Sequence, residues 1–274
     1  MRVLSLFDGV STGRLALERA GVPVSAYYAS EVCPRALRVS EANWGSRVTQ
    51  LGDVRLVEPP PDIDLLLAAP PCQGLSSAGK GAGLADPRSA LFWEAVRVLR
   101  ACRPRWFLFE STARMRAESR AVITAALGVE PLSINSRLVS AQNRPRLYWT
   151  NIPGACAPAD RGITLTSVVG PHEGVWVYPR WNMGGVTHYV GDKAPCVTTS
   201  NWQSNYRVQV TPDTRRNFTP EECERLQTFP PGYTSAAGCK THRYTLLGNA
   251  WTVDAIAHLL HGLGATPHAP DRGA

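Results

Sequence analysis

A cysteine with rigid flanks is the residue in this sequence best suited to covalent chemistry. Cys72 stands in the run Pro70-Pro71-Cys72-Gln73-Gly74-Leu75-Ser76, directly after the apolar stretch 65–69. Two prolines restrict the backbone at the end of this expected strand, and such rigidity suits a nucleophile presented at a crevice. A small cysteine packed under a loop is the common alternative. The flanking Pro-Pro and Gln-Gly favour the nucleophile.

A carboxylate and two arginines offer partners for this nucleophile. Glu110 ends the apolar run 107–109, and Arg144 and Arg146 occupy alternate positions. Neighbouring strand ends would bring Glu110 close to Cys72, an arrangement that suits a proton donor. The two guanidinium groups share one face if the chain is extended, where they could clamp a phosphate or a base oxygen. Ordinary surface arginines are the alternative.

A glycine-containing turn near the N-terminus favours a nucleotide site. Residues 4–13 have the pattern of a strand, a turn with Gly9 and Gly13, and the start of a helix. Open α/β sheets bind nucleotides at this place. Glu31 ends the second expected strand, where a carboxylate can accept hydrogen bonds from ribose hydroxyls. Turn glycines and a solvated carboxylate are the alternatives.

These residues require a scaffold of alternating strands and helices. Short apolar runs predict strands near 3–7, 24–30, 64–69, 106–109 and 134–139. Helical spacing predicts helices over 14–20, 34–43, 89–102 and 117–127. This alternation is typical of βαβ units with a parallel sheet. We therefore expect a doubly wound α/β domain over residues 1–152.

The amino-acid composition changes after residue 152. Residues 153–215 are rich in Gly, Pro, Thr, Trp and Asn, which predicts a small inserted β/loop domain. Thr219 and Pro220 then suit the start of a helix, and a second helix is expected over 253–263. Residues 216–264 should return to the first domain, and residues 265–274 form a tail expected to fray.

Composition limits the class of protein. The 274 residues carry 29 Lys and Arg against 22 Asp and Glu, a net charge of +7, which supports a polyanionic partner only weakly. Seven cysteines without a C-x₂₋₄-C pair indicate a reducing compartment and no zinc knuckle. We expect no signal peptide, no membrane span and a soluble chain, because no apolar run approaches the required length.

The order of these motifs resembles the DNA (cytosine-5) methyltransferase family over essentially the whole chain, most closely its de novo-type and its prokaryotic or phage members. Phe7-Asp8-Gly9 is similar to the cofactor loop, Gly52-Asp53-Val54 to the adenine-side turn and Pro71-Cys72-Gln73 to the nucleophile motif. Further matches are Glu31, Glu110, the Gln142, Arg144 and Arg146 triplet, Arg225-Leu226-Gln227-Thr228-Phe229-Pro230, and Gly248-Asn249-Ala250-Trp251.

The resemblance implies S-adenosylmethionine as cofactor, double-stranded DNA as partner, and no metal. It implies a Rossmann-like methyltransferase fold with a small target-recognition domain, in a cytoplasmic protein without a membrane or an obligate protein partner. The implied catalytic residues are Cys72, Glu110, Arg144 and Arg146. The implied cofactor residues are Phe7, Asp8, Gly9, Val10, Thr12, Glu31, Val32, Asp53, Val54, Pro71, Leu91, Asn249, Ala250 and Trp251.

Two departures from the family pattern matter. Ser11 stands where a second glycine is usual, and Ser111-Thr112 stand where Asn-Val follows the acid. The second change removes an amide expected to brace the nucleophile loop. It is the one argument for an alternative, a catalytically silent binding protein with the same fold. RNA cytosine methylation is another alternative, against which we note no Cys-Phe-Thr signature.

Target specificity is assigned to residues 153–215. The candidates to contact base edges are Trp181, Asn182, Thr198, Thr199, Asn201, Trp202 and Arg207. Each bidentate contact discriminates by ~1–3 kcal/mol, so a segment this small predicts a short site of roughly two to four base pairs. The alternative is recognition by the glycine-rich segment 79–83.

Overall fold

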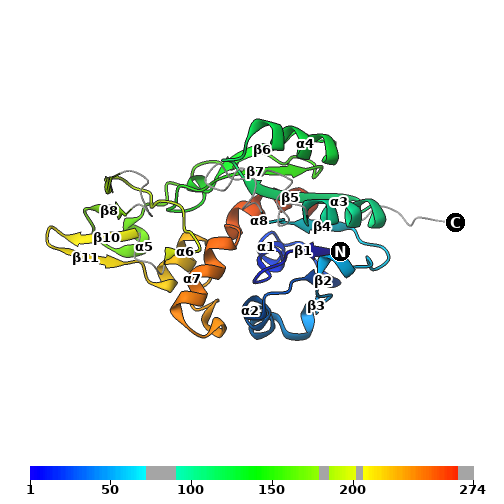
Figure 1. Ribbon diagram of the computed structural model, residues 1–274, viewed down its shortest axis with the longest axis horizontal. Helices are drawn as coiled ribbons and strands as arrows, with labels where there is room; N and C mark the ends of the chain where they lie inside the picture. The colour runs from blue at the N-terminus through cyan, green and yellow to red at the C-terminus, as the bar shows by residue number, and fades with distance from the viewer. Residues whose placement is uncertain (72–90, 179–184, 202–205, 265–274) are drawn as a thin grey trace.

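A seven-stranded sheet forms the centre of the computed structural model, which describes residues 1–71, 91–178, 185–201 and 206–264. Its strand order is β3-β2-β1-β4-β5-β7-β6 (Figure 1). The strands are β1 (Arg2–Leu6), β2 (Ala26–Ser30), β3 (Thr49–Gln50), β4 (Leu65–Ala68), β5 (Trp106–Thr112), β6 (Leu132–Asn135) and β7 (Pro145–Thr150). Strands β3, β2, β1, β4 and β5 pair in parallel, so their carboxyl ends meet at one edge.

Helices cover both faces of this sheet, with α3 and α4 on the opposite side from α1 and α2 (Figure 1). One core packs α1 (Thr12–Arg19), α2 (Pro34–Trp44) and α8 (Val253–Gly264) on the sheet, and the other packs α3 (Leu91–Cys102) and α4 (Ala117–Leu127). Along β4, Leu65 and Leu67 enter the first core while Leu66 and Ala68 enter the second, as the two-residue period of a strand requires. None of the helices in the described ranges is long and apolar enough to cross a membrane.

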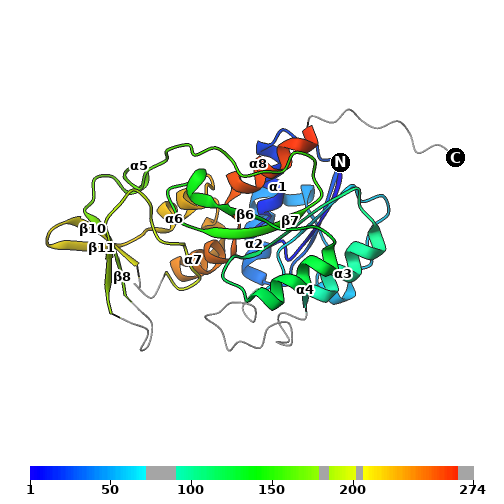
Figure 2. The same ribbon diagram turned by 90° about the horizontal axis from the view of Figure 1, so that it is seen from above.

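A smaller antiparallel sheet, ordered β11-β10-β8-β9, lies apart from the central sheet (Figures 1 and 2). It consists of β8 (Gly174–Val177), β9 (Thr187–Tyr189), β10 (Tyr206–Thr211) and β11 (Thr214–Asn217), beside the short α5 (Thr166–Val169). Helices α6 (Pro220–Leu226) and α7 (Lys240–Asn249) follow in sequence and lie between the two sheets (Figure 1). The described residues also contain single 3₁₀ turns: η1 (Gly45–Arg47), η2 (Val54–Leu56), η4 (Ser136–Leu138) and η6 (Ser235–Ala237).

The structure confirms the doubly wound α/β class and most expected elements, with three corrections. The sheet is mixed, because β7 runs antiparallel to both β5 and β6. The expected strand 134–139 ends at Asn135, where the Asn135 carboxamide accepts a hydrogen bond from the Arg137 amide and starts a 3₁₀ turn. Strand β7 and helix α7 were not predicted at all.

The predicted start of a helix at Thr219 is confirmed. Thr219 Oγ1 accepts from the Glu222 amide at 3.2 Å, and Glu222 Oε2 accepts from the Thr219 amide at 2.8 Å. This reciprocal capping box satisfies two amides that have no partner within the helix. Pro220 occupies the first turn as expected. The predicted tail 265–274 lies outside the described residues.

Candidate active site

A cavity of about 550 Å³ opens where the carboxyl ends of β1, β2 and β4 meet α7 and the residues after it. All fourteen residues predicted to bind a cofactor line this cavity, together with Glu110. Gly52, from the predicted adenine-side turn, lines it as well, and so do several residues that were not predicted: Ser5, Ser30, Cys33, Arg35, Ala36, Arg55, Ala69, Pro70, Thr245 and Leu246. Proximity to the motifs could have indicated most of these, but Thr245 and Leu246 are brought in only by the tertiary packing of α7.

The turn after β1 is held by two carboxylates. Gly9 adopts a φ of 61° and donates its amide to Glu31 Oε2 at 2.8 Å, which fastens the turn to the end of β2. Glu31 Oε1 accepts from the amides of Val32 and Cys33 at 2.8 and 2.7 Å. The Glu31 carboxylate is therefore fixed at the cavity wall by three backbone donors.

Asp8 braces the same turn from within the core. It is 7% exposed and accepts hydrogen bonds from Tyr27 Oη at 2.7 Å and from Ser11 Oγ at 2.6 Å. Burial raises the pKa of the Asp8 carboxyl, although these hydroxyl donors oppose the shift. Ser11 itself has a φ of 59°, a left-handed conformation that glycine adopts most easily. Its hydrogen bond to Asp8 gives a physical reason for serine at this position.

Asp53 ends the next loop with its side chain directed back to the backbone. Its Oδ1 accepts from the Arg55 amide at 3.0 Å and caps η2, and its carboxylate forms an ion pair with the Arg55 guanidinium. The hydrogen bonds from Arg55 lower the pKa of Asp53 to about 2. Arg55 is 67% exposed, so this lining carboxylate remains ionised beside a side chain that has room to move.

Glu110 has both carboxylate oxygens engaged. It lies in β5, and Arg146 from the antiparallel β7 forms an ion pair with it, with Nε 2.7 Å from Oε1. The indole Nε1 of Trp251 donates to Oε2 at 3.1 Å. The Glu110 side chain is only 12% exposed, so the ion pair and the hydrogen bond together determine the direction of a largely desolvated acid.

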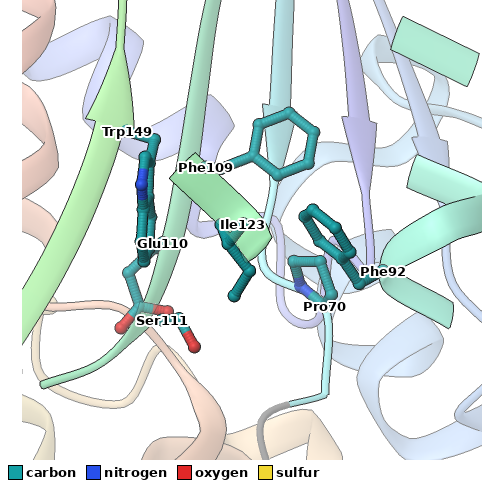
Figure 3. Close-up of a pocket in the computed structure, with 7 residues that line it drawn as sticks. All are labelled: Pro70, Phe92, Phe109, Glu110, Ser111, Ile123 and Trp149. Atoms are coloured by element: carbon teal, nitrogen blue, oxygen red, sulfur yellow. The ribbon is translucent and has the colours of Figure 1, made fainter. Parts of the chain in front are cut away.

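A second cavity of about 10 Å³ lies behind Glu110, with Pro70 on one side and Glu110 and Ser111 on the other (Figure 3). Ser111 Oγ is buried and has no hydrogen-bond partner within the described part of the chain. Pro70 and Pro71 also line the large cavity beside Glu110, as adjacent strand ends predict. Cys72, the next residue, lies outside the described residues, as do 79–83, Trp181, Asn182 and Trp202.

Arg144 and Arg146 point to the same side of the chain, as their alternate spacing predicted, and both lie next to the thiol of Cys196. Burial raises the pKa of this thiol, but the charges of Arg144 and Arg146 outweigh it and leave the pKa lower than usual. Their roles differ. Arg146 pairs with Glu110, whereas Arg144 is 3% exposed and donates to Val197 O at 2.9 Å, Gly248 O at 3.0 Å and Ala250 O at 2.8 Å. The expectation of a phosphate clamp is therefore corrected for Arg144, which fastens three chain segments together.

Three predicted base-contacting residues also lie against the large domain. Asn201 is 5% exposed, and its Oδ1 accepts from the amide and the hydroxyl of Thr198, both at 2.9 Å. The Thr199 backbone passes so close to α7 that a Cβ on Gly248 would lie 2.1 Å from the Thr199 amide nitrogen. These contacts are structural. Arg207 alone of the described candidates lies on the small sheet.

The comparisons with known proteins agree with this geometry. A family model described as C-5 cytosine-specific DNA methylase matches residues 1–127 and 163–264. The type II methyltransferase M.NgoBV of Neisseria gonorrhoeae is 32% identical over 173 residues, which cover 55% of this chain and 41% of that protein. M.BanI of Aneurinibacillus aneurinilyticus is 33% identical over 184 residues, or 62% and 42% of the two chains. The matched part is thus less than half of either relative.

Solved structures show the same fold at low identity. The Dnmt2 methyltransferase of S. pombe superposes with a TM-score of 0.66 and 18% identity, over 95% of this chain and 97% of that one. A putative DNA modification methyltransferase of an E. coli prophage gives 0.65 and 18%, over 96% and 98%.

Proposed function

Because this chain belongs to the C-5 cytosine-specific DNA methylase family, we propose that it transfers a methyl group to C5 of cytosine in double-stranded DNA. One observation carries the proposal: a half-buried Glu110, held by an ion pair and a hydrogen bond, shares a cavity with Pro70 and Pro71, the residues that lead to Cys72. A proton-sharing acid beside a nucleophile is the arrangement that addition to a pyrimidine ring requires.

The cavity fits S-adenosylmethionine as the methyl donor. Its volume of about 550 Å³ lies in the range of small-molecule sites. The fixed carboxylate of Glu31 suits ribose hydroxyls, and Asp53 with Val54 suits the adenine side. Phe7, Gly9, Leu91 and Asn249 would complete the walls. When bound, S-adenosylmethionine supplies an electrophilic methyl group on its sulfonium sulfur.

The residues of this chain would then act on a cytosine taken out of the duplex, at a cost of a few kcal/mol in unpairing. The Cys72 thiolate forms a bond to C6, and the ring electrons move toward N3. Glu110 shares a proton with N3 and stabilises the developing charge, which makes C5 nucleophilic. After C5 has been methylated and has lost its proton to a base, the Cys72–C6 bond breaks by elimination.

A trapping experiment tests this function. The wild-type chain, incubated with S-adenosylmethionine and duplex DNA that contains 5-fluorocytosine, should give an adduct resistant to denaturation, because fluorine at C5 blocks elimination. Cys72→Ala should give no adduct and still bind DNA. Tritium transfer to duplex DNA and to tRNA should favour DNA. No transfer to either, with DNA binding intact, would instead support the silent binding protein.

The small sheet supports the assignment of target recognition to residues 153–215. Pairing places Arg207 opposite Trp176 and Trp176 opposite His188, so the three side chains share one face. The Arg207 guanidinium lies 5.0 Å from the Tyr178 ring, and that of Arg215 lies 3.9 Å from the Trp176 ring. Stacked arginines suit base edges and phosphates. Val175 and Val208 occupy the opposite, buried face.

We expect the recognition site to be short, roughly two to four base pairs, because one small sheet offers few bidentate contacts. Sequencing methylated cytosines in DNA from cells that express the chain measures this directly, and six defined bases would contradict it. Transfer of residues 153–215 into a relative should transfer the target. A role in restriction–modification is supported by the relatives, which are type II methyltransferases.

A further inference from the structure

The indole of Trp251 contacts two functional regions at once. Its ring lines the large cavity, and its Nε1 donates to Glu110 Oε2 at 3.1 Å. The ring also lies near the start of α1, since a Cβ on Gly13 would be 3.7 Å from Trp251 Cζ3. Trp251 is 7% exposed, so its position is set by packing.

The backbone before Trp251 and the carboxylate of Glu110 are both held by the short segment 144–146. Arg144 donates to Gly248 O and Ala250 O at 3.0 and 2.8 Å, and Gln227 Nε2 donates to Ala250 O at 3.0 Å. Two residues after Arg144, Arg146 holds the other oxygen of Glu110 at 2.7 Å. The contacts form a closed ring that runs from Glu110 through Arg146, Arg144, Ala250 and Trp251 back to Glu110.

We propose that Trp251 is a positioning residue, which directs the Glu110 carboxyl group and couples its orientation to occupancy of the cofactor cavity. This inference rests on the proposed function and adds a link between its two halves. If Arg146 were the sole partner of its carboxylate, Glu110 would have a broad distribution of its terminal side-chain torsion angle, because the energy changes little on rotation about an sp³–sp² bond. A second donor on Oε2 selects one direction. A ligand packed against the indole would shift Trp251 Nε1 and with it the carboxyl group of Glu110. Small displacements of a catalytic acid lower the rate of methyl transfer steeply.

The kinetic test compares Trp251→Phe with a matched control, Trp149→Phe. Phenylalanine keeps an aromatic ring in the cavity but removes the N–H. Trp149 is a buried tryptophan of β7 whose ring also lines the small cavity behind Glu110, but its Nε1 donates to Thr124 at 2.9 Å and not to Glu110. We expect Trp251→Phe to lower kcat about tenfold and to change the Kd for S-adenosylhomocysteine less than about threefold. Trp149→Phe should change both kcat and this Kd by less than about threefold. Equal losses in kcat and binding, or a wild-type kcat, would overturn the proposal.

A double-mutant cycle asks whether Trp251 acts through Glu110. In a Glu110→Ala background, Trp251→Phe should change the single-turnover rate by less than about twofold, because the carboxylate that accepts the indole hydrogen bond is already absent. A further tenfold loss would show an independent role.

A spectroscopic readout is independent of activity. In protein labelled with ¹⁵N-tryptophan, the indole N–H resonance missing from Trp251→Phe identifies Trp251. We expect this resonance to move in Glu110→Ala and also when S-adenosylhomocysteine is added to the wild type. If it moves in neither case, the proposed coupling is refuted. If the wild type transfers no methyl group to DNA, the proposed function fails, and the response of this resonance still decides the role of Trp251.

Discussion

Arg144 provides the sharpest test of the structural argument, because the sequence suggested a ligand-binding role and the structure assigns it to the fold. Its guanidinium donates to Val197 O, Gly248 O and Ala250 O and contacts Cys196 Sγ at 3.1 Å. Arg144→Ala deletes all of these donors at a site that is 3% exposed.

The expected loss of stability follows from those contacts. A hydrogen bond from a charged group contributes about 1.5–3 kcal/mol. Ala250 O keeps its bond from Gln227, so we count the bonds to Val197 O and Gly248 O. Arg144→Ala should therefore lower the free energy of unfolding by roughly 3–6 kcal/mol. Since a domain is stable by about 5–15 kcal/mol, the variant should be close to unfolding at 37 °C. The stability of Arg144→Lys should lie between that of the wild type and that of Arg144→Ala, because one ammonium cannot make all the contacts of the planar guanidinium.

Urea unfolding measures this loss of unfolding free energy. The salt dependence of DNA binding tests the alternative role, in which Arg144 contacts a DNA phosphate. A residue that contacts a phosphate would leave unfolding unchanged and, when removed, reduce the salt slope of DNA binding by about 1. We expect the opposite pattern: a large fall in the urea midpoint and an unchanged salt slope in whatever fraction remains folded. A stable Arg144→Ala protein with a reduced slope would refute the assignment.

Three further predictions concern the acid, the first turn and α7. Glu110→Gln should lower kcat far more than DNA affinity, since the hydrogen bond to N3 strengthens as charge develops; equal losses would contradict this. Asp8→Asn removes a carboxyl whose pKa is raised by burial, so the folded wild type binds more protons than the unfolded chain between the ordinary pKa of 3.8 and the raised pKa of the folded state. Relative to Asp8→Asn, urea unfolding should show the wild type losing stability as the pH rises from about 4 through the folded pKa of Asp8, and a difference independent of pH would contradict this. Gly248→Ala would place a Cβ 2.1 Å from the Thr199 amide nitrogen, so the thermal midpoint should fall with a loss of at least about 2 kcal/mol; an unchanged midpoint would show that this segment moves freely.

Much of the site could be predicted because its residues follow apolar strands. Gly9 and Glu31 follow β1 and β2, Glu110 lies near the end of β5, and parallel strands bring their carboxyl ends to one edge of a sheet. This rule accounts for the residues of the cavity that follow β1, β2 and β4. Leu91 at the start of α3, and Asn249, Ala250 and Trp251 at the end of α7, were predicted from the resemblance to the family, and they line the same cavity.

The antiparallel strand β7 could not be predicted in the same way. Its residues Leu147, Tyr148 and Trp149 are apolar and aromatic, but the inclusion of the strand between β5 and β6 depends on pairing with residues 10 to 42 positions away. Such pairing depends on which edges of the sheet are already occupied. The local hydrophobic periodicity of the sequence does not indicate this.

By itself the sequence determined which residue types stand at the ends of the strands, and with them the fold class and the chemistry of the site. Only the tertiary structure decided what each side chain touches. Arg144 and Arg146 are the same residue type, two positions apart and directed to the same side, yet one supports the backbone of 248–250 and the other orients Glu110. Their partners are supplied by chain segments far away in sequence, and the burial that makes those contacts strong exists only after the domain has packed.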